Sequence, residues 1–525
     1  MSYTKKTLLL ILFATIVRCI TSAFIELGND EVYYRMYAQQ LQWNYFDHPP
    51  MVGWLIRFTT ACLRFDHEFF IRLGAIVSAA ISTWIIFLCG SKINNAHTGY
   101  LAAVLYTASI FGSIIAGIFI LPDSPQMVCW AAGIYLLLKI TSYTQINRTK
   151  KRDLLLFAVV AGLGMLCKIH MAFLWLGFLW YIVQHNRQWL KEPALYLSGI
   201  ISILLFYPVI QWNINHHFVT YLYHSKRVDV TVGGIDPGSF ISFNAGQAFY
   251  INPIVFVLII MATIAAFKNN LPVMISQKRL LLLCSLPLIV TATVVSLFKQ
   301  VLPHWTGPAF FGLILLAACY LAKQKIKPSF RKRIMPRSLA AACSLQLLII
   351  IAGVLLINFM PGTLGSKDKL HLGEGDFTLD MYGWKGLKKE FEKITAGDLR
   401  LGSMKKSAVI ISNKWFPAAH IDHYVAMPLQ RKLVAIGDIN EIHQYAWINR
   451  ERGALQAGDD AYCIIPSNNY VDVREHYGRD FMTIETPLLI EQKRNGKICR
   501  YFYIWRLKNY ITNKASVYNN GGLFH

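Results

Sequence analysis

Charge is scarce in this sequence. Only 15% of its 525 residues are Asp, Glu, Lys or Arg, whereas a soluble domain carries about 25%. Acidic residues are scarcer than basic ones, with 29 Asp and Glu against 52 Lys and Arg, and the formal net charge is +23. Many apolar runs instead approach or exceed the ~20 residues that cross a hydrocarbon core. This balance excludes an ordinary soluble enzyme, and basic residues in excess are typical of cytoplasmic loops rather than of a nucleic-acid-binding surface.

Two common functional signatures are also missing. None of the ten cysteines forms a CxxC pair, which removes the usual zinc and thiol-redox motifs. Gly373, Gly375 and Gly383 lack the spacing of a nucleotide-binding fingerprint. Cys463 and Cys499 lie in the polar C-terminal region, where a disulfide and two free thiols are the alternatives if that region is extracytoplasmic.

The apolar runs predict a polytopic α-helical membrane protein. Candidate spans lie near 7–25, 71–90, 98–120, 125–142, 193–212, 247–267, 280–298, 305–322 and 338–358. The run 153–185, with Lys168 and His170 at its middle, is long for one span and short for two. If it folds as a hairpin, the Lys and Arg clusters, including the one at 323–337, fall on one side of the membrane. We therefore predict about 11 spans, a cytoplasmic N terminus and a retained first span.

This topology predicts two domains. Residues 1–360 form a membrane-embedded catalytic domain whose external loop 26–70 carries the active site, and residues 361–525 form a periplasmic α/β domain. In the second domain, strand-like runs alternate with helical stretches, and 488–494 and 497–507 flank Asn495-Gly496 as a hairpin. We interpret His420, Asp422 and His423 as part of a solvated helix face rather than as a zinc site.

The few acidic residues of the membrane half concentrate on the predicted external face. Asp30 and Glu31 directly follow the first span, and Asp123 lies in the turn Leu121-Pro-Asp-Ser-Pro125. Carboxylates at span ends are costly in lipid and tend to mark function. One at this depth can take a proton from a hydroxyl, and nearby Arg, Lys or His can neutralise a phosphate. The alternatives are a helix cap for the first pair and a proline-bounded turn for the second.

Several motifs carry a family resemblance. The Asp30-Glu31 pair, the run Tyr45-Phe-Asp-His-Pro-Pro50 and the turn 121–125 resemble the family 39-type (PMT-2) bacterial glycosyltransferases of the GT-C fold. That family is related to protein O-mannosyltransferases and the aminoarabinose lipid A transferase. The segments 162–168, 212–216 and 302–305 are similar to its later parts, so the resemblance covers most of residues 1–360.

The resemblance implies inverting sugar transfer without a nucleotide-sugar site. Asp30 matches the catalytic-base position and Asp123 the second external Asp, with Glu31 as the third catalytic candidate. The aminoarabinose transferases have basic residues where this chain has Tyr33 and His48-Pro49. The candidates for binding substrate or phosphate are therefore Tyr34, Arg35, Asp47, His48, Arg57, Lys168 and His216. No cofactor is required, and a divalent metal held near the phosphate by His48, His216, His217 or His224 is the alternative.

These expectations combine into one functional hypothesis. The chain moves a hexose or pentose from a polyprenyl-phosphate carrier to a periplasmic acceptor, which is lipid A or its core, another glycan or a protein. It resides among the lipids of a bacterial inner membrane. One alternative is a lipid or sugar transporter, or flippase, which predicts discontinuous spans and inverted repeats. Another is a membrane-anchored binding protein whose working part is residues 361–525.

Overall fold

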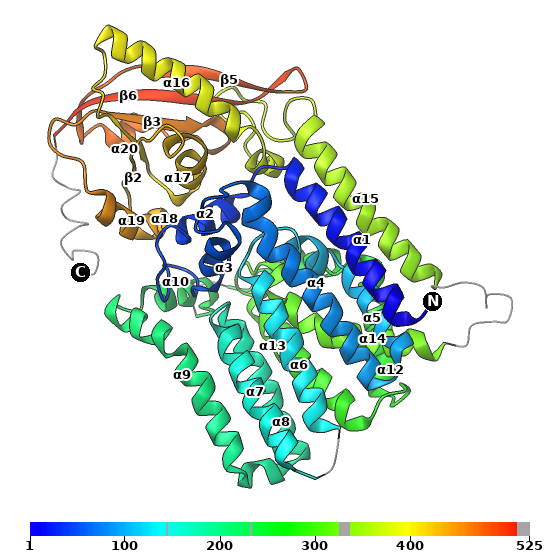
Figure 1. The fold of residues 1–525 in the computed structure, drawn as a ribbon. Helices are drawn as coiled ribbons and strands as arrows, with labels where there is room; N and C mark the ends of the chain where they lie inside the picture. Colours follow the sequence, from blue (N-terminus) through cyan, green and yellow to red (C-terminus); the bar gives the residue numbers. More distant parts are fainter. Residues whose placement is uncertain (143–144, 232–233, 325–335, 512–525) are drawn as a thin grey trace. The chain divides into compact units, whose positions relative to one another are not determined.

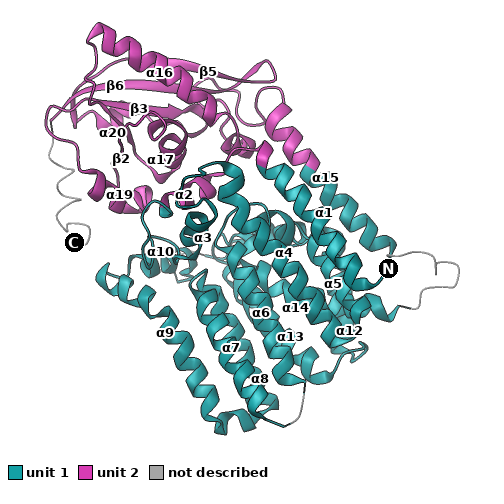
Figure 2. Ribbon diagram, in the orientation of Figure 1, with its two compact units in different colours: residues 1–22, 37–350 teal, residues 23–36, 351–525 magenta. Residues whose placement is uncertain are grey.

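The computed structural model describes residues 1–142, 145–231, 234–324 and 336–511. Most of the Lys- and Arg-rich segment 323–337 lies outside these ranges. Two compact units are present (Figure 2). Unit 1 consists of Met1–Ser22 and Tyr37–Ile350, and unit 2 consists of Ala23–Met36 and Ile351–His525. Residues 23–36 thus pack with the C-terminal part of the chain, although their neighbours in sequence belong to unit 1.

Unit 1 is built from helices (Figure 1). Short turns interrupt them: the π-turn η1 (Phe111–Ile115) and the 3₁₀ turns η2 (Ile169–Met171), η3 (Arg187–Lys191) and η4 (Pro303–Ala309). The helices are α1 (Tyr3–Phe24), α3 (Met51–Thr59), α4 (Glu68–Ile93), α5 (Ala96–Ala108), α6 (Asp123–Thr141), α7 (Arg148–Met165), α8 (Ala172–His185), α9 (Pro193–Asn215), α10 (Val219–Val228), α11 (Pro237–Tyr250), α12 (Pro253–Phe267), α13 (Ile275–Val295), α14 (Phe310–Lys323) and α15 (Arg337–Phe359). The last residues of α1 and α15 belong to unit 2.

Within the described ranges, six helices are long and apolar enough to cross a membrane: α1, α4, α9, α13, α14 with the turn before it, and α15. The bent pair α11 and α12, which turns by 98°, would make a seventh. The prediction of about 11 spans is therefore not confirmed by the described residues. The difference lies in α5 and α8, which have only 13 and 14 residues, and in α6 and α7, which are long enough to span but less apolar. The run 153–185 does divide into two helices, α7 and α8, with Lys168 at the turn.

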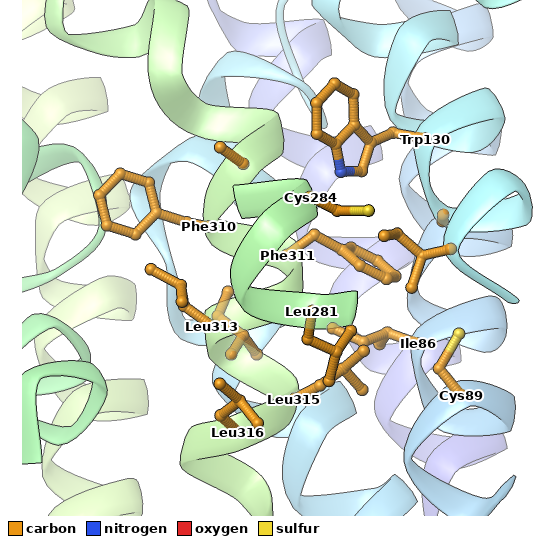
Figure 3. Close-up of a cluster of buried hydrophobic side chains, with 14 of the residues drawn as sticks. Ile86, Cys89, Trp130, Leu281, Cys284, Phe310, Phe311, Leu313, Leu315 and Leu316 are labelled. Atoms are coloured by element: carbon orange, nitrogen blue, oxygen red, sulfur yellow. The ribbon is translucent and has the colours of Figure 1, made fainter. Parts of the chain in front are cut away.

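The centre of unit 1 is α14. The apolar stretch of α14 and η4 is 83% buried, against 28% for α1 and 22% for α15. Figure 3 shows Phe311 and Leu315 of α14 meeting Ile86 of α4 and Leu281 of α13. The peripheral helices keep large apolar side chains on the outside, as a lipid environment requires. The central packing fixes η4, which contacts the start of α6.

Unit 2 contains a six-stranded mixed sheet with the order β2-β1-β3-β6-β4, and β5 also pairs with β6. The pairs β1–β2 and β1–β3 are parallel, whereas β6 runs antiparallel to β3, β4 and β5. The strands are β1 (Val409–Ser412), β2 (Leu433–Ala435), β3 (Ala461–Pro466), β4 (Phe481–Ile484), β5 (Leu488–Arg494) and β6 (Lys497–Tyr510). The helices are α2 (Asn29–Tyr37), α16 (Trp384–Leu401), α17 (Trp415–Ile421), α18 (Ile439–Ile442), α19 (Tyr445–Arg452) and α20 (Val473–Tyr477). The predicted α/β character of this region is confirmed.

The hairpin formed by β5 and β6 was readable from its turn. Asn495 and Gly496 have φ values of 45° and 78°, and a tight turn with two left-handed residues matches the right-handed twist of the flanking strands. The disulfide alternative is wrong, because Cys463 and Cys499 are both free. Cys463 of β3 lies opposite Trp505 of β6, and Trp505 is six residues after Cys499 on the same strand. That separation corresponds to about 20 Å of extended strand.

A buried ion pair ties the hairpin to the rest of unit 2. Arg494 Nη2 lies 3.0 Å from Asp376 Oδ2, and neither side chain is exposed. The same guanidinium donates to Thr378 Oγ1 at 2.7 Å and to the carbonyl of Gly362 at 3.0 Å. Since the pair is dry, its stability depends on both partners being present.

Arg494→Met is expected to destabilise unit 2 by about 3–5 kcal/mol, because it leaves the Asp376 carboxylate buried without its cation. Thermal or denaturant unfolding of the full chain in detergent measures the effect. The matched control is the neighbouring Lys493→Met, whose exposed pairing with Glu491 contributes at most about 1 kcal/mol. Equal stability of the two variants would contradict the packing described for Arg494.

Candidate active site

The Asp30-Glu31 pair opens helix α2 of unit 2. Asp30 is exposed in the first turn of the helix, where a negative charge interacts favourably with the unpaired N–H groups. Glu31 is buried, and its Oε2 accepts a hydrogen bond of 2.9 Å from the N–H of Gly28. This is half of a capping box, in which the third helical residue reaches back to the residue before the helix. The contact gives Glu31 a structural task, whereas Asp30 keeps its carboxylate at the surface.

The segment before α2 is bound to the α/β domain. The Glu26 carboxylate accepts from the N–H groups of Trp384 at 2.7 Å and Lys385 at 3.2 Å. It thereby caps the N terminus of α16. Burial raises the pKa of Glu26, while the two backbone hydrogen bonds act in the opposite direction. The N–H of Leu27 donates to the hydroxyl of Tyr424 at 2.9 Å.

The histidines of the C-terminal region do not form a solvated face. The side chains of His420 and Asp422 are 0% and 1% exposed. His420 Nε2 lies 2.9 Å from Asn29 Oδ1, and the Asp422 carboxylate accepts from Arg452 at 2.8 Å and Tyr445 at 3.0 Å. The interpretation as a surface is therefore wrong. It failed because His420 packs against Asn29 from 391 positions earlier in the chain, and Asp422 is bound by Tyr445 and Arg452 of α19.

In unit 1, Asp123 and Lys168 form a buried ion pair. Lys168 Nζ lies 3.0 Å and 2.9 Å from the two oxygens of Asp123, and the side chains are 7% and 3% exposed. Asp123 is the first residue of α6, and Lys168 precedes η2 at the turn between α7 and α8. Both sequence candidates thus meet in one place. The sequence predicts Lys168 as a phosphate ligand. In the structure its positive charge is already paired with the Asp123 carboxylate.

Further basic groups surround this pair. His170 and His304 lie within electrostatic range of Asp123. The ring centroids of His48 and His224 are 5.8 Å apart, and the Arg227 guanidinium lies 5.3 Å from the Trp305 ring. Burial lowers the pKa of His48 well below its ordinary value, and His224, Lys168, His170 and Arg227 contribute further. We call His48, His170, His224, His304, Lys168 and Arg227, together with Asp123, the basic cluster.

Other candidates make local contacts. The Arg57 guanidinium donates to the carbonyls of Ala38 at 2.9 Å and Gln39 at 3.1 Å, so it fastens the loop after α2. The Asp47 carboxylate accepts a hydrogen bond from the hydroxyl of Tyr37. The backbone carbonyl oxygen of Asp47 lies 2.6 Å from His224 Nε2.

Three remaining candidates lie on helices. His216 ends α9 with its ring stacked 3.9 Å above Trp212. In unit 2, Tyr34 and Arg35 are buried in α2, and Arg35 lies 3.2 Å from the sulfur of Met427.

Sequence reasoning missed several members of these groups. Arg227 carries no motif, and His304 was noted only as part of a weak family segment. One signal in the sequence could have found them. Both residues follow predicted spans that end on the same, external face of the membrane. Among the described residues, no group of three or more His, Cys, Asp or Glu is placed to hold a metal ion, so the metal alternative gains no support from His48, His216, His217 and His224.

Comparison with known proteins agrees with the fold and the motifs. Residues 47–212 match the family model described as dolichyl-phosphate-mannose-protein mannosyltransferase (PMT-2). The lipid A galacturonosyltransferase RgtD of Rhizobium johnstonii is 20% identical over 321 residues, which cover 60% of this chain and 66% of that protein. The chain therefore matches slightly less than two thirds of the length of this curated relative.

Solved structures extend the likeness to the whole chain. The crystal structure of ArnT from Cupriavidus metallidurans in the apo state superimposes with a TM-score of 0.59 at 12% identity, covering 95% of this chain and 98% of that one. The ArnT structure bound to undecaprenyl phosphate gives 0.60 at 13% identity with the same coverage. The chain has the GT-C membrane fold with a C-terminal α/β domain. Its resemblance to the PMT-2 glycosyltransferases is confirmed, with residues 47–212 as the matching segment.

The pairing of Asp123 with Lys168 predicts strong coupling between them. Lys168→Met and Asp123→Asn are each expected to destabilise the chain by about 3–5 kcal/mol, because each leaves a buried polar partner unpaired. The double variant is expected to lose clearly less than the sum of the two, as measured by thermal unfolding in detergent. Lys151→Met and Glu192→Gln, which break a more exposed pair, serve as the control cycle, with about 0–1 kcal/mol each. Additive losses at Asp123 and Lys168 would refute the pairing.

Proposed function

We propose that this chain is an inverting glycosyltransferase that moves a sugar from a polyprenyl-phosphate carrier to an acceptor hydroxyl. The observation that carries the proposal is the basic cluster of unit 1, which gathers histidines, Lys168 and Arg227 around one carboxylate. Such a concentration of donors in a weakly hydrated region suits a phosphate group. The PMT-2 segment and the galacturonosyltransferase relative support the same chemistry.

In the proposed reaction, Asp30 is the general base. Its carboxylate takes the proton of the acceptor hydroxyl as that oxygen attacks the anomeric carbon of the donor sugar. The bond between this carbon and the phosphate oxygen breaks, and its electron pair leaves with the polyprenyl phosphate. Attack from the face opposite the leaving group inverts the anomeric centre. Asp30 suits this role because its side chain is exposed, whereas Glu31 is buried and caps the start of α2 through its bond to Gly28.

The basic cluster receives the charge of the leaving phosphate. The donor phosphodiester carries one negative charge, and cleavage produces a monoester with a second. Lys168 and the histidines can supply hydrogen bonds and positive charge where this second charge develops. Asp123 holds Lys168 in place and partly neutralises the positive charge of the cluster before the donor binds. The proposal needs no metal ion for this step.

Setting and acceptor follow from the same proposal. The chain resides in a bacterial inner membrane, with the Asp30 loop and the C-terminal domain in the periplasm. ArnT has been crystallised with undecaprenyl phosphate, and we infer a carrier of that class here. The galacturonosyltransferase relative acts on lipid A, which makes lipid A or its core the acceptor to test first, before other glycans and proteins.

A transporter is the second candidate. The 98° bend between α11 and α12 is a break of the kind found in the discontinuous helices of transporters. Reconstituted vesicles separate the two functions. Glycosyl transfer produces a covalently modified acceptor, whereas a transporter or flippase moves the labelled lipid across the bilayer without changing it.

Asp30→Asn is expected to lower the turnover of sugar transfer by about 10²–10⁴-fold, because an amide cannot accept the acceptor proton. Transfer of sugar to purified lipid A by the reconstituted full chain, followed by mass spectrometry, measures the effect. Expression and melting temperature are expected to match the wild type, since Asp30 is exposed.

The control for that experiment is Asp66→Asn, which removes another exposed carboxylate of the first external loop. Its turnover is expected to stay within about twofold of the wild type, as for most surface substitutions. Turnover by the Asp30 variant at the level of this control would rule out Asp30 as the base.

Donor binding is expected to strengthen as the pH falls from 8 to 6. The pKa values of His48 and His224 lie below the ordinary value, chiefly through burial, so both rings are neutral at pH 8. A bound phosphate raises both pKa values, so binding takes up protons and is favoured at lower pH. The donor phosphodiester does not titrate in this range, and its dissociation constant therefore reports on the protein. We expect at least about threefold tighter binding at pH 6 than at pH 8.

The double variant His48→Gln/His224→Gln is the control for this pH dependence. It keeps polar side chains at both positions but removes these two titratable rings, so its affinity is expected to change less between pH 6 and 8 than that of the wild type, with His170 and His304 as the remaining histidines of the cluster. A wild-type affinity that does not change with pH would contradict the proposed contact between these histidines and the phosphate.

A further inference from the structure

The side chain of Asn29, the residue directly before Asp30, is held from two sides within unit 2. Its Oδ1 lies 2.9 Å from His420 Nε2, and its amide bonds to the Asp380 carboxylate. A carboxylate accepts hydrogen bonds, so the Asn29 NH₂ group must face Asp380. Its carbonyl oxygen must then accept from His420. Both the orientation of the amide and the tautomer of the histidine, with its proton on Nε2, follow from this arrangement.

The His420 ring is fixed by stacking. It lies parallel to Trp384 with the ring centroids 4.3 Å apart, and parallel to Tyr424 at 6.0 Å. The Arg500 guanidinium covers Trp384 at 4.3 Å. Burial, followed by the charges of Arg500 and His423, lowers the pKa of His420 well below its ordinary value. The ring therefore stays neutral, and it cannot rotate away from Asn29 without losing its aromatic contacts.

The backbone on each side of Asp30 is anchored to the same domain. Before it, Glu26 caps α16 and the N–H of Leu27 donates to Tyr424. After it, the hydroxyl of Tyr33 accepts from the N–H of Gln444 at 3.1 Å. These contacts come from residues of α16, of the turn after α17 and of the start of α19. The first turn of α2 is thus held by the C-terminal domain, while the Asp30 side chain is exposed.

Asp380 adds an electrostatic effect. Burial raises its pKa to about 6, with Asn29 and Arg500 acting to lower it and the charges of Asp30 and Asp376 acting to raise it. Asp30 and Asp380 therefore influence each other. When Asp380 is ionised, its negative charge makes Asp30 a stronger base.

We propose that His420 and Asp380 are positioning residues that hold Asn29 and thereby orient Asp30 for proton abstraction. The C-terminal domain then contributes to catalysis by orienting the base. This inference rests on the proposed function for the role of Asp30, but the docking of residues 26–33 can be tested without it.

The first test compares two substitutions of His420. His420→Phe keeps an aromatic ring in the stack and removes the N–H donor, whereas His420→Gln supplies a side-chain N–H in its place. We expect His420→Phe to lower kcat by about 10–100-fold, with KM for the donor within about twofold. His420→Gln is expected to recover most of kcat. Wild-type kcat in His420→Phe, or no recovery in His420→Gln, would overturn the positioning role.

Tyr462→Phe is the matched control for stability. It removes a hydrogen bond of 2.9 Å to Asp398 in the same domain, and neither residue has a described contact with residues 23–36. Its melting temperature is expected to fall about as far as that of His420→Phe, with kcat unchanged. An equal loss of kcat in both variants would mean that domain stability alone accounts for the effect.

The second test uses the pH profile of Asp380→Asn. Removing the negative charge of Asp380 lowers the pKa of Asp30, so the acidic limb of the kcat/KM profile is expected to move to lower pH. A loss of packing without an electrostatic role would lower activity equally at every pH. An acidic limb in the same place as in the wild type would overturn the contribution of Asp380.

Hydrogen–deuterium exchange of peptides covering residues 25–36 provides a measurement that does not depend on activity. Exchange is expected to be faster in His420→Phe and unchanged in Tyr462→Phe and Asp30→Asn. Unchanged exchange in His420→Phe would refute the docking itself. If docking is confirmed while Asp30→Asn retains full turnover, the proposed function of Asp30 fails and the docking stands.

Discussion

A charge buried away from water has no partner except another part of the protein, and the Asp123–Lys168 pair shows the result. One carboxylate at the start of α6 meets one amine at the turn between α7 and α8, both almost completely buried. A single unpaired charge here would cost several kcal/mol, so each side requires the other. The pair therefore fixes the N terminus of α6 against the turn between α7 and α8. The histidines gathered around it owe their low basicity to the same lack of water.

Unit 2 meets a different constraint, because its polar groups are buried within a small α/β domain. Arg494, Arg500 and His420 are all buried there, and each has hydrogen-bond partners from distant parts of the chain. The N-terminal segment 23–36 supplies one of those partners, since Asn29 bonds to His420. The domain formed by the last third of the chain thus includes a short segment next to the first membrane helix, which completes its packing.

Much of the fold could be predicted from local patterns. Apolar runs revealed the membrane helices, alternating strand-like and helical stretches indicated the α/β domain, and Asn495-Gly496 identified the hairpin turn. The number of spans was less accessible, because α5 and α8 are shorter than a full span and α7 begins with a run of charged residues. For the site, the sequence identified Asp123 and Lys168 as candidates but gave no sign that they neutralise each other. It also misjudged His420, because periodicity within one helix cannot reveal a covering segment from elsewhere.

The cap that Glu26 provides for α16 has a consequence for biosynthesis. The N-terminal segment leaves the ribosome first, but its partners Trp384, His420 and Gln444 are made last. Asn29 and His420 are separated by 391 positions, which corresponds to about 20–80 s of translation. During that interval the first loop lacks these partners. The protein therefore acquires the geometry around Asp30 only when synthesis is nearly complete, so an unfinished chain lacks it.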